Sequence, residues 1–528
     1  MAGRSSFPLV FVAFAAGAAT MTVELAAVRL LAPWYGTSSA VWTNVIGVVL
    51  AALSLGYLAG ARVSAAPDPR RLLGLLLVAA GAASAWLPWL ARPVARLFLP
   101  DGLTLEEAGP ALASGSLASA LLLFAPPAFL LGTIAPLVAE ALERGGRATA
   151  GAATGRVLAA STLGSLLGTF GTTYVFVPEA GLSATYLGAG AALAGLGLPF
   201  LVATRARAPA LAGLALVGAA LWASRTSAPA LPAGVRLLES RETLLQSARV
   251  VESGDGPERM RRLEVNESLG SFQSVWQPEP GPLPAGYYYN AFALPAWWGR
   301  PPGAWRVLVL GLGAGTAWRV LEGALPPGVE FESTGVEIDP GVVELGRRWM
   351  DLPGASRADR IVAAGVDGRA ALRFVPQRFD LLVLDAYQNQ VEIPPQLASV
   401  EFFAEAARCL ASDGILVANV GAFGLDDPVL EALARTMAKG FERRVLAVRV
   451  PFSRNVALFA RVEGEPPDPR SEQFAPPTGP LARLAASMAL DGGSRWFEVP
   501  ERAPLDDDRN PILSLQRASV ERAARSRP

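Results

Sequence analysis

Seven long apolar runs fill the first 224 residues and limit what this part of the chain can fold into more than any other feature. They cover residues 8–31, 41–62, 71–91, 113–142, 151–177, 182–203 and 208–224. Most approach the ~20 apolar residues that a helix needs to cross the hydrocarbon core of a bilayer. Small residues such as Gly164, Gly168 and Gly171 let such helices pack closely. We therefore expect residues 1–230 to form a transmembrane domain of six or seven spans.

Composition indicates a chain of several domains and narrows its chemistry. The 528 residues are too many for one ordinary domain, and a mean hydropathy of +0.34 is too high for a wholly soluble protein. The formal net charge is zero, so nothing indicates nucleic acid as a partner. The chain has no histidine, which excludes Ser-His-Asp and Cys-His sites and leaves proton transfer to Asp, Glu, Tyr, Lys439 or water. Its single cysteine, Cys409, excludes an intrachain disulfide.

Residues 305–339 carry the pattern of a nucleoside-binding unit. A short apolar run ends in a glycine loop, a helical pattern follows, and a second apolar run ends in Glu337. The loop glycines are Gly311, Gly313 and Gly315. Such a loop lets the backbone approach a nucleoside, and an acid at the end of the next strand can hold both ribose hydroxyls. The further glycine typical of pyrophosphate sites is missing, and Asp385 ends a later apolar run, which together favour S-adenosylmethionine or its decarboxylated form.

The remaining patterns predict a small β lid followed by an α/β domain. Short alternating segments over 235–300 are typical of β-hairpins. Over 301–465 strand and helix patterns alternate, which is typical of a mostly parallel sheet covered on both faces. The expected strands are 330–337, 379–385 and 414–420, and the expected helices are 340–350, 398–410 and 427–439.

Two further β-rich runs, 443–450 and 455–462, are expected to pair antiparallel at the edge of this sheet. Residues 466–528 are expected to form a partly ordered tail able to fold over the site. The predicted fold is therefore a multi-pass α-helical membrane domain followed by an α/β class I methyltransferase-like (Rossmann-like) domain with a small N-terminal β lid.

In combination these motifs resemble one known family. The glycine loop, VEID ending at Asp339, the pair Asp367–Gly368 and the run FDLLVLDAYQNQVEIPPQLASVEFFAEAARCLASDGILVANV resemble the spermidine synthase (polyamine aminopropyltransferase) family. The apolar half and the DDDRNP motif resemble its membrane-fused branch. The resemblance covers nearly the whole chain. It implies transfer of an aminopropyl group from decarboxylated S-adenosylmethionine to a small-molecule amine, without a metal, by a protein of the lipid bilayer that could be a homodimer.

The resemblance also implies roles for individual residues. The implied donor-binding residues are Gln246, Gly311, Gly313, Gly315, Glu337, Asp367 and Gly368. Gln273 and Tyr289 match positions that line the amine channel, and Asp385 matches the place where amine and donor meet. For Asp367 the alternative is a loop-capping role, and for Asp385 a strand-end carboxylate near helix dipoles. The functional interpretation is favoured because ligands of such sheets bind at strand ends.

Three positions depart from the family pattern. Ala314 and Gln388 replace two acids, and Asn290 replaces a lid histidine. An alkyl amine with a pKa of ~10 is almost wholly protonated at pH 7, and a glutamine cannot accept its proton. The catalytic candidates are therefore Asp385 and Tyr387 beside Gln388, with Glu392 and the tail acids Asp506, Asp507 and Asp508 as substitutes. Of these, Asp507 is also a substrate-binding candidate.

Three functions remain open. The first is aminopropyl transfer to an amine at the membrane. The second is methyl or alkyl transfer from intact S-adenosylmethionine to a membrane-delivered acceptor, because Ala314 removes a carboxylate that would repel the carboxylate of that donor. The third is a non-catalytic polyamine or nucleoside sensor or transporter, supported by Glu24 within the first apolar run.

Arginines between the apolar runs bear on orientation in the membrane. They follow the second, fourth and sixth runs, as Arg62, Arg70, Arg71, Arg144, Arg147, Arg205 and Arg207. The positive-inside rule places these loops and the start of the first run in the cytoplasm. The donor is made in the cytoplasm. If the catalytic half is also cytoplasmic, the chain must cross the membrane an even number of times. We therefore expect the short seventh run to be interfacial or re-entrant in a plasma-membrane protein of bacterial type.

Overall fold

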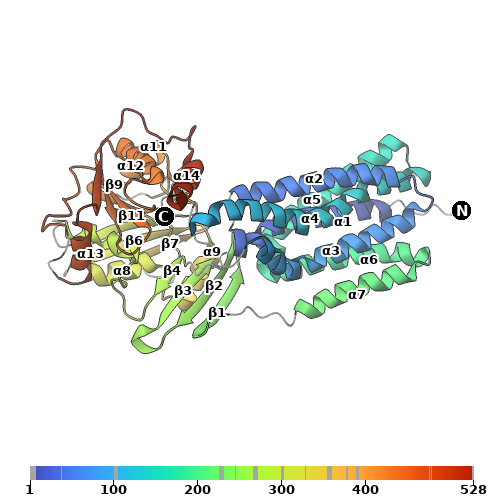
Figure 1. Ribbon diagram of the computed structural model, residues 1–528, viewed down its shortest axis with the longest axis horizontal. Helices are drawn as coiled ribbons and strands as arrows, with labels where there is room; N and C mark the ends of the chain where they lie inside the picture. Colours follow the sequence, from blue (N-terminus) through green and yellow to red (C-terminus); the bar gives the residue numbers. More distant parts are fainter. Residues whose placement is uncertain are drawn as a thin grey trace.

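The structure, a computed structural model, describes residues 7–525 except 37–38, 100–104, 147, 225–230, 244, 266–271, 299–302, 327–328, 354–358, 376–377, 388–391, 475 and 477. A long helical bundle is followed by an α/β domain at one of its ends (Figure 1). This arrangement confirms the predicted fold class.

Each apolar run forms one helix of the bundle. The helices are α1 (Phe7–Tyr35), α2 (Ser39–Val63), α3 (Pro69–Phe98), α4 (Leu105–Arg144), α5 (Ala150–Gly171), α6 (Leu182–Ala203) and α7 (Arg207–Ser224). Within the described residues, five of them, α1 to α4 and α6, are long and apolar enough to cross a bilayer. Helix α5 continues as a π-helix over Thr172–Ala180.

Small residues bring α1 and α5 into close contact. A Cβ atom at Gly164 would clash with the backbone oxygen of Phe14, and one at Gly168 would clash with that of Ala18. Without a hydrophobic force between helices in lipid, such close packing supplies the contact energy. The small residues therefore act as predicted at these two positions, whereas Gly171 faces the ring of Phe176 of its own π-helical extension.

The seventh run is a helix that passes along the bundle, a course that does not favour the expected interfacial or re-entrant segment. Helix α7 packs against α3 and α6 and runs back toward the α/β domain. Its 18 residues reach ~27 Å at 1.5 Å per residue, close to the thickness of a hydrocarbon core. Consequently the start of α1 and the α/β domain lie at opposite ends of the bundle (Figure 1).

The α/β domain is built on an eight-stranded sheet with helices on both faces. Its strands are β5 (Ala304–Leu310), β6 (Glu330–Glu337), β7 (Arg360–Ala364), β8 (Phe379–Leu384), β9 (Leu410–Gly421), β10 (Val445–Arg449), β11 (Asn455–Arg461) and β12 (Ser494–Phe497), in the order β12-β10-β11-β9-β8-β5-β6-β7. Strands β5 to β9 are parallel, and β10 to β12 join antiparallel. Alternate residues of β5 enter opposite cores, Leu308 and Leu310 on one face and Val307 and Val309 on the other.

The helices of this domain include those predicted over 340–350, 398–410 and 427–439. They are α8 (Thr316–Ala324), α9 (Pro340–Trp349), α10 (Gly368–Ala371), α11 (Val400–Arg408), α12 (Pro428–Phe441), α13 (Pro480–Met488) and α14 (Ile512–Arg525). Apolar residues of α11 and α12 fill one core, and those of α8 and α13 fill the other. The helices therefore cover both faces of the sheet.

The lid is a four-stranded antiparallel sheet, in the order β1 (Val235–Glu242), β2 (Ser247–Ser253), β3 (Met260–Val265) and β4 (Ser274–Trp276). The expected hairpin strand after it is instead a 3-10 helix, Tyr288–Trp297. The helix contains Pro295, which cannot donate to a strand ladder, and a continuous run of buried residues, whereas a lid strand would alternate.

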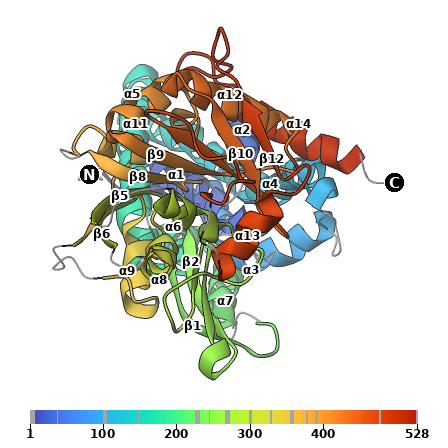
Figure 2. The same ribbon diagram turned by 90° about the vertical axis from the view of Figure 1, so that its left-hand side faces the viewer.

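The tail is more ordered than expected. Strand β12 pairs with β10, so the predicted hairpin of β10 and β11 does not form the edge of the sheet. Helix α14 packs on both α12 and the bundle helix α4 (Figure 2). The tail therefore joins the two parts of the molecule.

Candidate active site

A cavity of about 920 Å³ lies where the bundle meets the carboxyl ends of the parallel strands. This is the usual ligand position in such sheets, and the volume is at the upper end for small-molecule sites. Ten of the sequence-predicted residues line it: Gln246, Gln273, Tyr289, Gly311, Gly313, Glu337, Asp367, Gly368, Asp385 and Tyr387. Gly315 and Asp507 are not among the lining residues, and Gln388 lies outside the described part of the chain.

Glu337 ends β6 and faces the glycine loop. Its carboxylate accepts hydrogen bonds from the backbone N–H groups of Gly313 (2.8 Å) and Asp339 (3.0 Å). Burial raises its pKa to about 7, although these two hydrogen bonds favour the charged form. Gly311 adopts φ +85°, and a Cβ there would clash with the backbone of Asp385. The loop can therefore lie directly between two strand ends.

Gly315 has a different role from the one expected. It caps α8 at φ +95° and packs on the side chain of Leu352, away from the cavity. A residue with a side chain would strain the turn at this position. The strand-to-helix turn therefore explains why a glycine occupies position 315, without any contact with a ligand.

Asp367 caps α10 and also lines the cavity. One carboxylate oxygen accepts the N–H groups of Arg369 and Ala370, both at 3.0 Å. The other oxygen accepts the side-chain amide of Gln396 at 3.4 Å. The capping interpretation is therefore correct, and it fixes the carboxylate at the cavity wall beside Gly368.

Asp385 follows β8 and is held by two side chains. It accepts hydrogen bonds from the Tyr288 hydroxyl (3.1 Å) and the Asn419 amide (2.8 Å). Asn455 in turn donates to Asn419 at 2.8 Å. Desolvation raises the pKa of Asp385 to about 7, against these hydrogen bonds and with the nearby Glu337 adding to the rise. A carboxylate with that pKa accepts a proton better than an ordinary one.

Aromatic side chains surround the space next to Asp385. The rings of Tyr288 and Tyr289 stack at 4.2 Å. The Tyr289 hydroxyl donates to the backbone of Gln273 at 2.8 Å, while the side-chain oxygen of Gln273 has no partner among the described residues. Such rings and a spare acceptor suit an ammonium group.

Tyr387 is committed to the backbone. Its hydroxyl donates to Asn419 O at 2.8 Å and accepts the Gly421 N–H at 3.0 Å. Burial raises the pKa of this hydroxyl above the ordinary range of a tyrosine. The phenol therefore positions the loop after β8 and is unsuited to accept a proton near pH 7.

Two of the positions that depart from the family pattern, Ala314 and Asn290, are described, and their present side chains are buried outside the cavity lining. Ala314 is buried, and its N–H donates to Ser274 at 2.9 Å. Asn290 is buried too, with both ends of its amide bonded to the backbone of Leu283 at 2.8 Å. Neither residue lines the cavity. Asn290 thus has a structural role in the lid.

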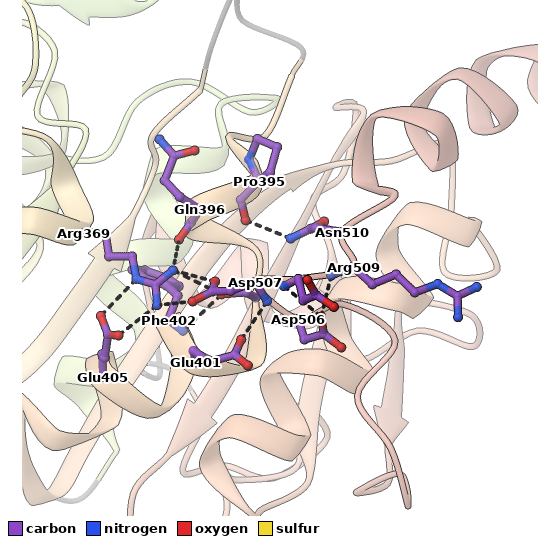
Figure 3. Close-up of polar contacts among 12 residues, drawn as sticks. Arg369, Pro395, Gln396, Glu401, Phe402, Glu405, Asp506, Asp507, Arg509 and Asn510 are labelled. Atoms are coloured by element: carbon purple, nitrogen blue, oxygen red, sulfur yellow. Dashed lines mark hydrogen bonds and ion pairs between the residues drawn. The ribbon is translucent and has the colours of Figure 1, made fainter.

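The tail acids do not supply the expected base. Asp507 forms a two-point ion pair with Arg369, at 2.6 and 2.7 Å, and Arg369 also pairs with Glu405 (Figure 3). Arg369 holds the pKa of Asp507 below its ordinary range. The prediction that Asp507 binds substrate is therefore replaced by a role in fastening the tail beside α10.

Bundle residues line the other side of the cavity, which the sequence interpretation missed. They are Leu25, Val28, Arg29, Trp42 and Thr173. Arg29 donates to the backbone oxygen of Thr243 at 2.7 Å, and the Thr243 hydroxyl donates to Asp339 at 2.6 Å. A charged residue inside an apolar run was the available signal for Arg29. Asn419, a polar residue inside the apolar strand β9, was the corresponding signal near Asp385.

Fold and site together define an α/β domain of the class I methyltransferase-like type, joined to a helical bundle that lines the same cavity. The described residues contain no cluster of three or more His, Cys, Asp or Glu side chains that could hold a metal ion.

Two curated proteins and one solved structure show similarity to the chain. No protein-family model matches the chain. It is 35% identical over 266 residues to a probable polyamine aminopropyl transferase of Bifidobacterium longum, covering 49% of this chain and 56% of that protein. It is 28% identical over 390 residues to the polyamine aminopropyltransferase of Mycobacterium tuberculosis, covering 69% and 70%. A solved structure of a probable spermidine synthase from Corynebacterium glutamicum aligns with a TM-score of 0.38 at 20% identity, over 53% of this chain and 94% of that one.

The chain is therefore similar in sequence to curated polyamine aminopropyltransferases. The match to the Bifidobacterium protein spans little more than half of that relative's length.

Proposed function

We propose that the protein transfers an aminopropyl group from decarboxylated S-adenosylmethionine to an amine. The support is the sequence similarity to curated polyamine aminopropyltransferases and a cavity that joins a nucleoside-type loop to a carboxylate. In this proposal Glu337 holds the ribose, Asp367 and Gly368 the adenine edge, and Gln246 the donor from the lid. Gln273 and Tyr289 border the amine.

The observation that carries this proposal is the position of Asp385 between the glycine loop and the stacked tyrosines, with its pKa raised to about 7. The amine nitrogen attacks the carbon next to the sulfonium, the C–S bond breaks, and its electron pair stays on sulfur to leave methylthioadenosine. The proton of the amine passes to Asp385. Since Tyr387 and Asp507 are committed elsewhere, Asp385 is the base that the described lining residues offer.

The direct test uses the full chain in phosphatidylcholine nanodiscs with decarboxylated S-adenosylmethionine and an amine. We expect release of methylthioadenosine and a product heavier by one aminopropyl group. Calorimetric titration with decarboxylated and intact S-adenosylmethionine and with methylthioadenosine identifies the donor. Binding of none of the three would contradict the proposal.

A second donor is favoured by one observation. Position 314 carries a buried alanine, so no carboxylate there pairs with the amino group of an aminopropyl chain or repels the carboxylate of intact S-adenosylmethionine. Preference for intact S-adenosylmethionine in the titration would make methyl or alkyl transfer the function.

We also propose that the bundle lies in a membrane with the α/β domain on the cytoplasmic face. Five long apolar helices support the membrane location. The cytoplasmic side follows from the proposed reaction, since the donor is a charged nucleoside made in the cytoplasm. The reaction cannot proceed without its donor, whereas the positive-inside rule describes only a tendency of arginines. We therefore base the orientation on the donor.

A further inference from the structure

The cavity that holds the proposed reaction is poor in acidic groups. Among its described lining residues only Glu337, Asp367 and Asp385 are acidic, and two arginines, Arg29 and Arg454, also line it. A diamine carries two ammonium groups at pH 7. Asp385 can pair with the reacting end. Glu337 and Asp367 belong to the nucleoside part, so the described lining offers no acid to a second ammonium.

Leaving a charge unpaired in such a site is costly. The lining thus disfavours a polycation and suits an acceptor with one amine. Gln273, with its unpartnered side-chain oxygen, provides one further neutral contact for that amine beside Tyr289.

Large apolar side chains form the outer wall of the same cavity. Five lining residues expose large apolar side chains: Trp42, Leu245, Ile338, Phe423 and Phe452. Phe452 is the extreme case, with 91% of its surface exposed and a left-handed backbone at φ +57°. A bulky residue in this conformation is strained, and such strain is often kept for function. We call these five residues the apolar rim.

The apolar rim continues into the bundle. Leu25 and Val28 of α1 and Trp42 of α2 belong to helices that are long and apolar enough to lie in a bilayer, and they share one cavity with Asp385. A hydrocarbon body that reaches from the bilayer along this wall would cover the exposed side chains, at ~25 cal/mol per Å² of apolar surface removed from water.

We propose that the acceptor is an amphiphilic primary amine drawn from the bilayer, with its amine at Asp385 and its hydrocarbon body along the apolar rim. This inference rests on the proposed function. The chemistry is unchanged: the C–N bond forms at the aminopropyl carbon, the C–S bond breaks, methylthioadenosine leaves, and the amine proton passes to Asp385.

The test compares dodecylamine with 1,4-diaminobutane as acceptors in phosphatidylcholine nanodiscs, with decarboxylated S-adenosylmethionine and methylthioadenosine release as the readout. We expect kcat/KM to be at least tenfold higher for dodecylamine. Equal or higher kcat/KM for 1,4-diaminobutane overturns the inference and leaves the proposed function intact. No release with either amine overturns the proposed function and the inference with it.

Phe452→Asp provides a second measurement, with Phe452→Asn as its matched neutral control. Both residues tolerate a left-handed backbone and the site is exposed, so folding is preserved. The added carboxylate should shift the ratio of kcat/KM values at least tenfold toward 1,4-diaminobutane, while the asparagine variant shifts it less. An unchanged ratio in Phe452→Asp overturns the assignment of the rim to the acceptor.

Discussion

Arg29 of the bundle and Thr243 of the lid are joined by a hydrogen bond of 2.7 Å from the guanidinium to the backbone oxygen. From Thr243 the contacts continue through its hydroxyl to Asp339 and through the Asp339 N–H to Glu337. Each contact is between groups that are at least partly buried, so little water competes for them. Helix α1 is therefore connected by hydrogen bonds to the carboxylate proposed to hold the ribose.

Arg29→Gln is expected to raise the KM for the donor about tenfold with a smaller change in kcat, because the variant loosens the lid loop that orients Asp339 and Glu337. Arg29→Lys should recover part of the loss. Arg96→Gln, an exposed arginine on α3, is the control. A fall in kcat at constant KM would contradict a positioning role.

Asp385→Asn is expected to lower kcat by about 10²–10⁴-fold, the range for loss of a general base. In the wild type, activity should rise with pH through about 7, since Asp385 must be ionised to accept a proton and its pKa is raised to that value. The asparagine variant should lose this rise. Glu392→Gln serves as the comparison, because Glu392 is not a lining residue. An unchanged pH profile in Asp385→Asn would assign the base elsewhere.

Glu337 should make nucleoside binding pH-dependent. Its pKa is raised to about 7 by burial, and the ionised form accepts ribose hydroxyls better than the neutral form. The affinity for methylthioadenosine, a neutral probe without the aminopropyl group, should therefore fall as pH drops through 7. Calorimetry at several pH values measures this. Glu337→Gln should bind weakly with a flat profile, and a persistent pH dependence in that variant would exclude Glu337 as its source.

The predictable part of the fold is the part set by local pattern. Apolar runs and strand–helix alternation predicted α1 to α7 and the parallel strands β5, β6, β8 and β9, because each pattern is complete within its own segment. Strand β12 is different, since its four residues become a strand only by pairing with β10. Asp507 likewise gains its role from Arg369, which is far away in the sequence.

The same distinction applies to the site. Strand-end residues such as Glu337 and Asp385 could be placed from sequence, because the carboxyl ends of parallel strands meet at one edge. Arg29 and the apolar rim could not, as they enter the cavity through the packing of the bundle against the α/β domain. Asp367 both caps α10 and lines the cavity, and its proposed contact with the donor stays a prediction.

Asp507→Asn should loosen the tail without altering the cavity. The ion pair with Arg369 is partly exposed, with 44% of the Asp507 side chain accessible, so a loss of about 1 kcal/mol is expected. Because the folded pKa of Asp507 is depressed, its contribution is present above about pH 4 and is lost as pH falls further. Thermal unfolding at pH 7 and limited proteolysis of the tail measure the effect. Asp508→Asn is the matched control, and equal behaviour of both variants would contradict the fastening role.

Membrane orientation also tests the proposed function, because the start of α1 and the α/β domain lie at opposite ends of the bundle. A Cys409→Ser background with either Ala65→Cys, in the loop after α2, or Asp508→Cys, in the tail, can be labelled with a membrane-impermeant maleimide. With a cytoplasmic α/β domain, intact cells should label Ala65→Cys alone, and permeabilised cells should label both. This orientation leaves the arginine-rich loops outside, against the usual bias. Labelling of Asp508→Cys alone in intact cells would place the α/β domain outside the cell, as the arginine bias predicts. The domain would then have no access to the cytoplasmic donor, which contradicts the proposed function. Equal labelling of both positions in intact cells would mean that α7 does not complete the crossing.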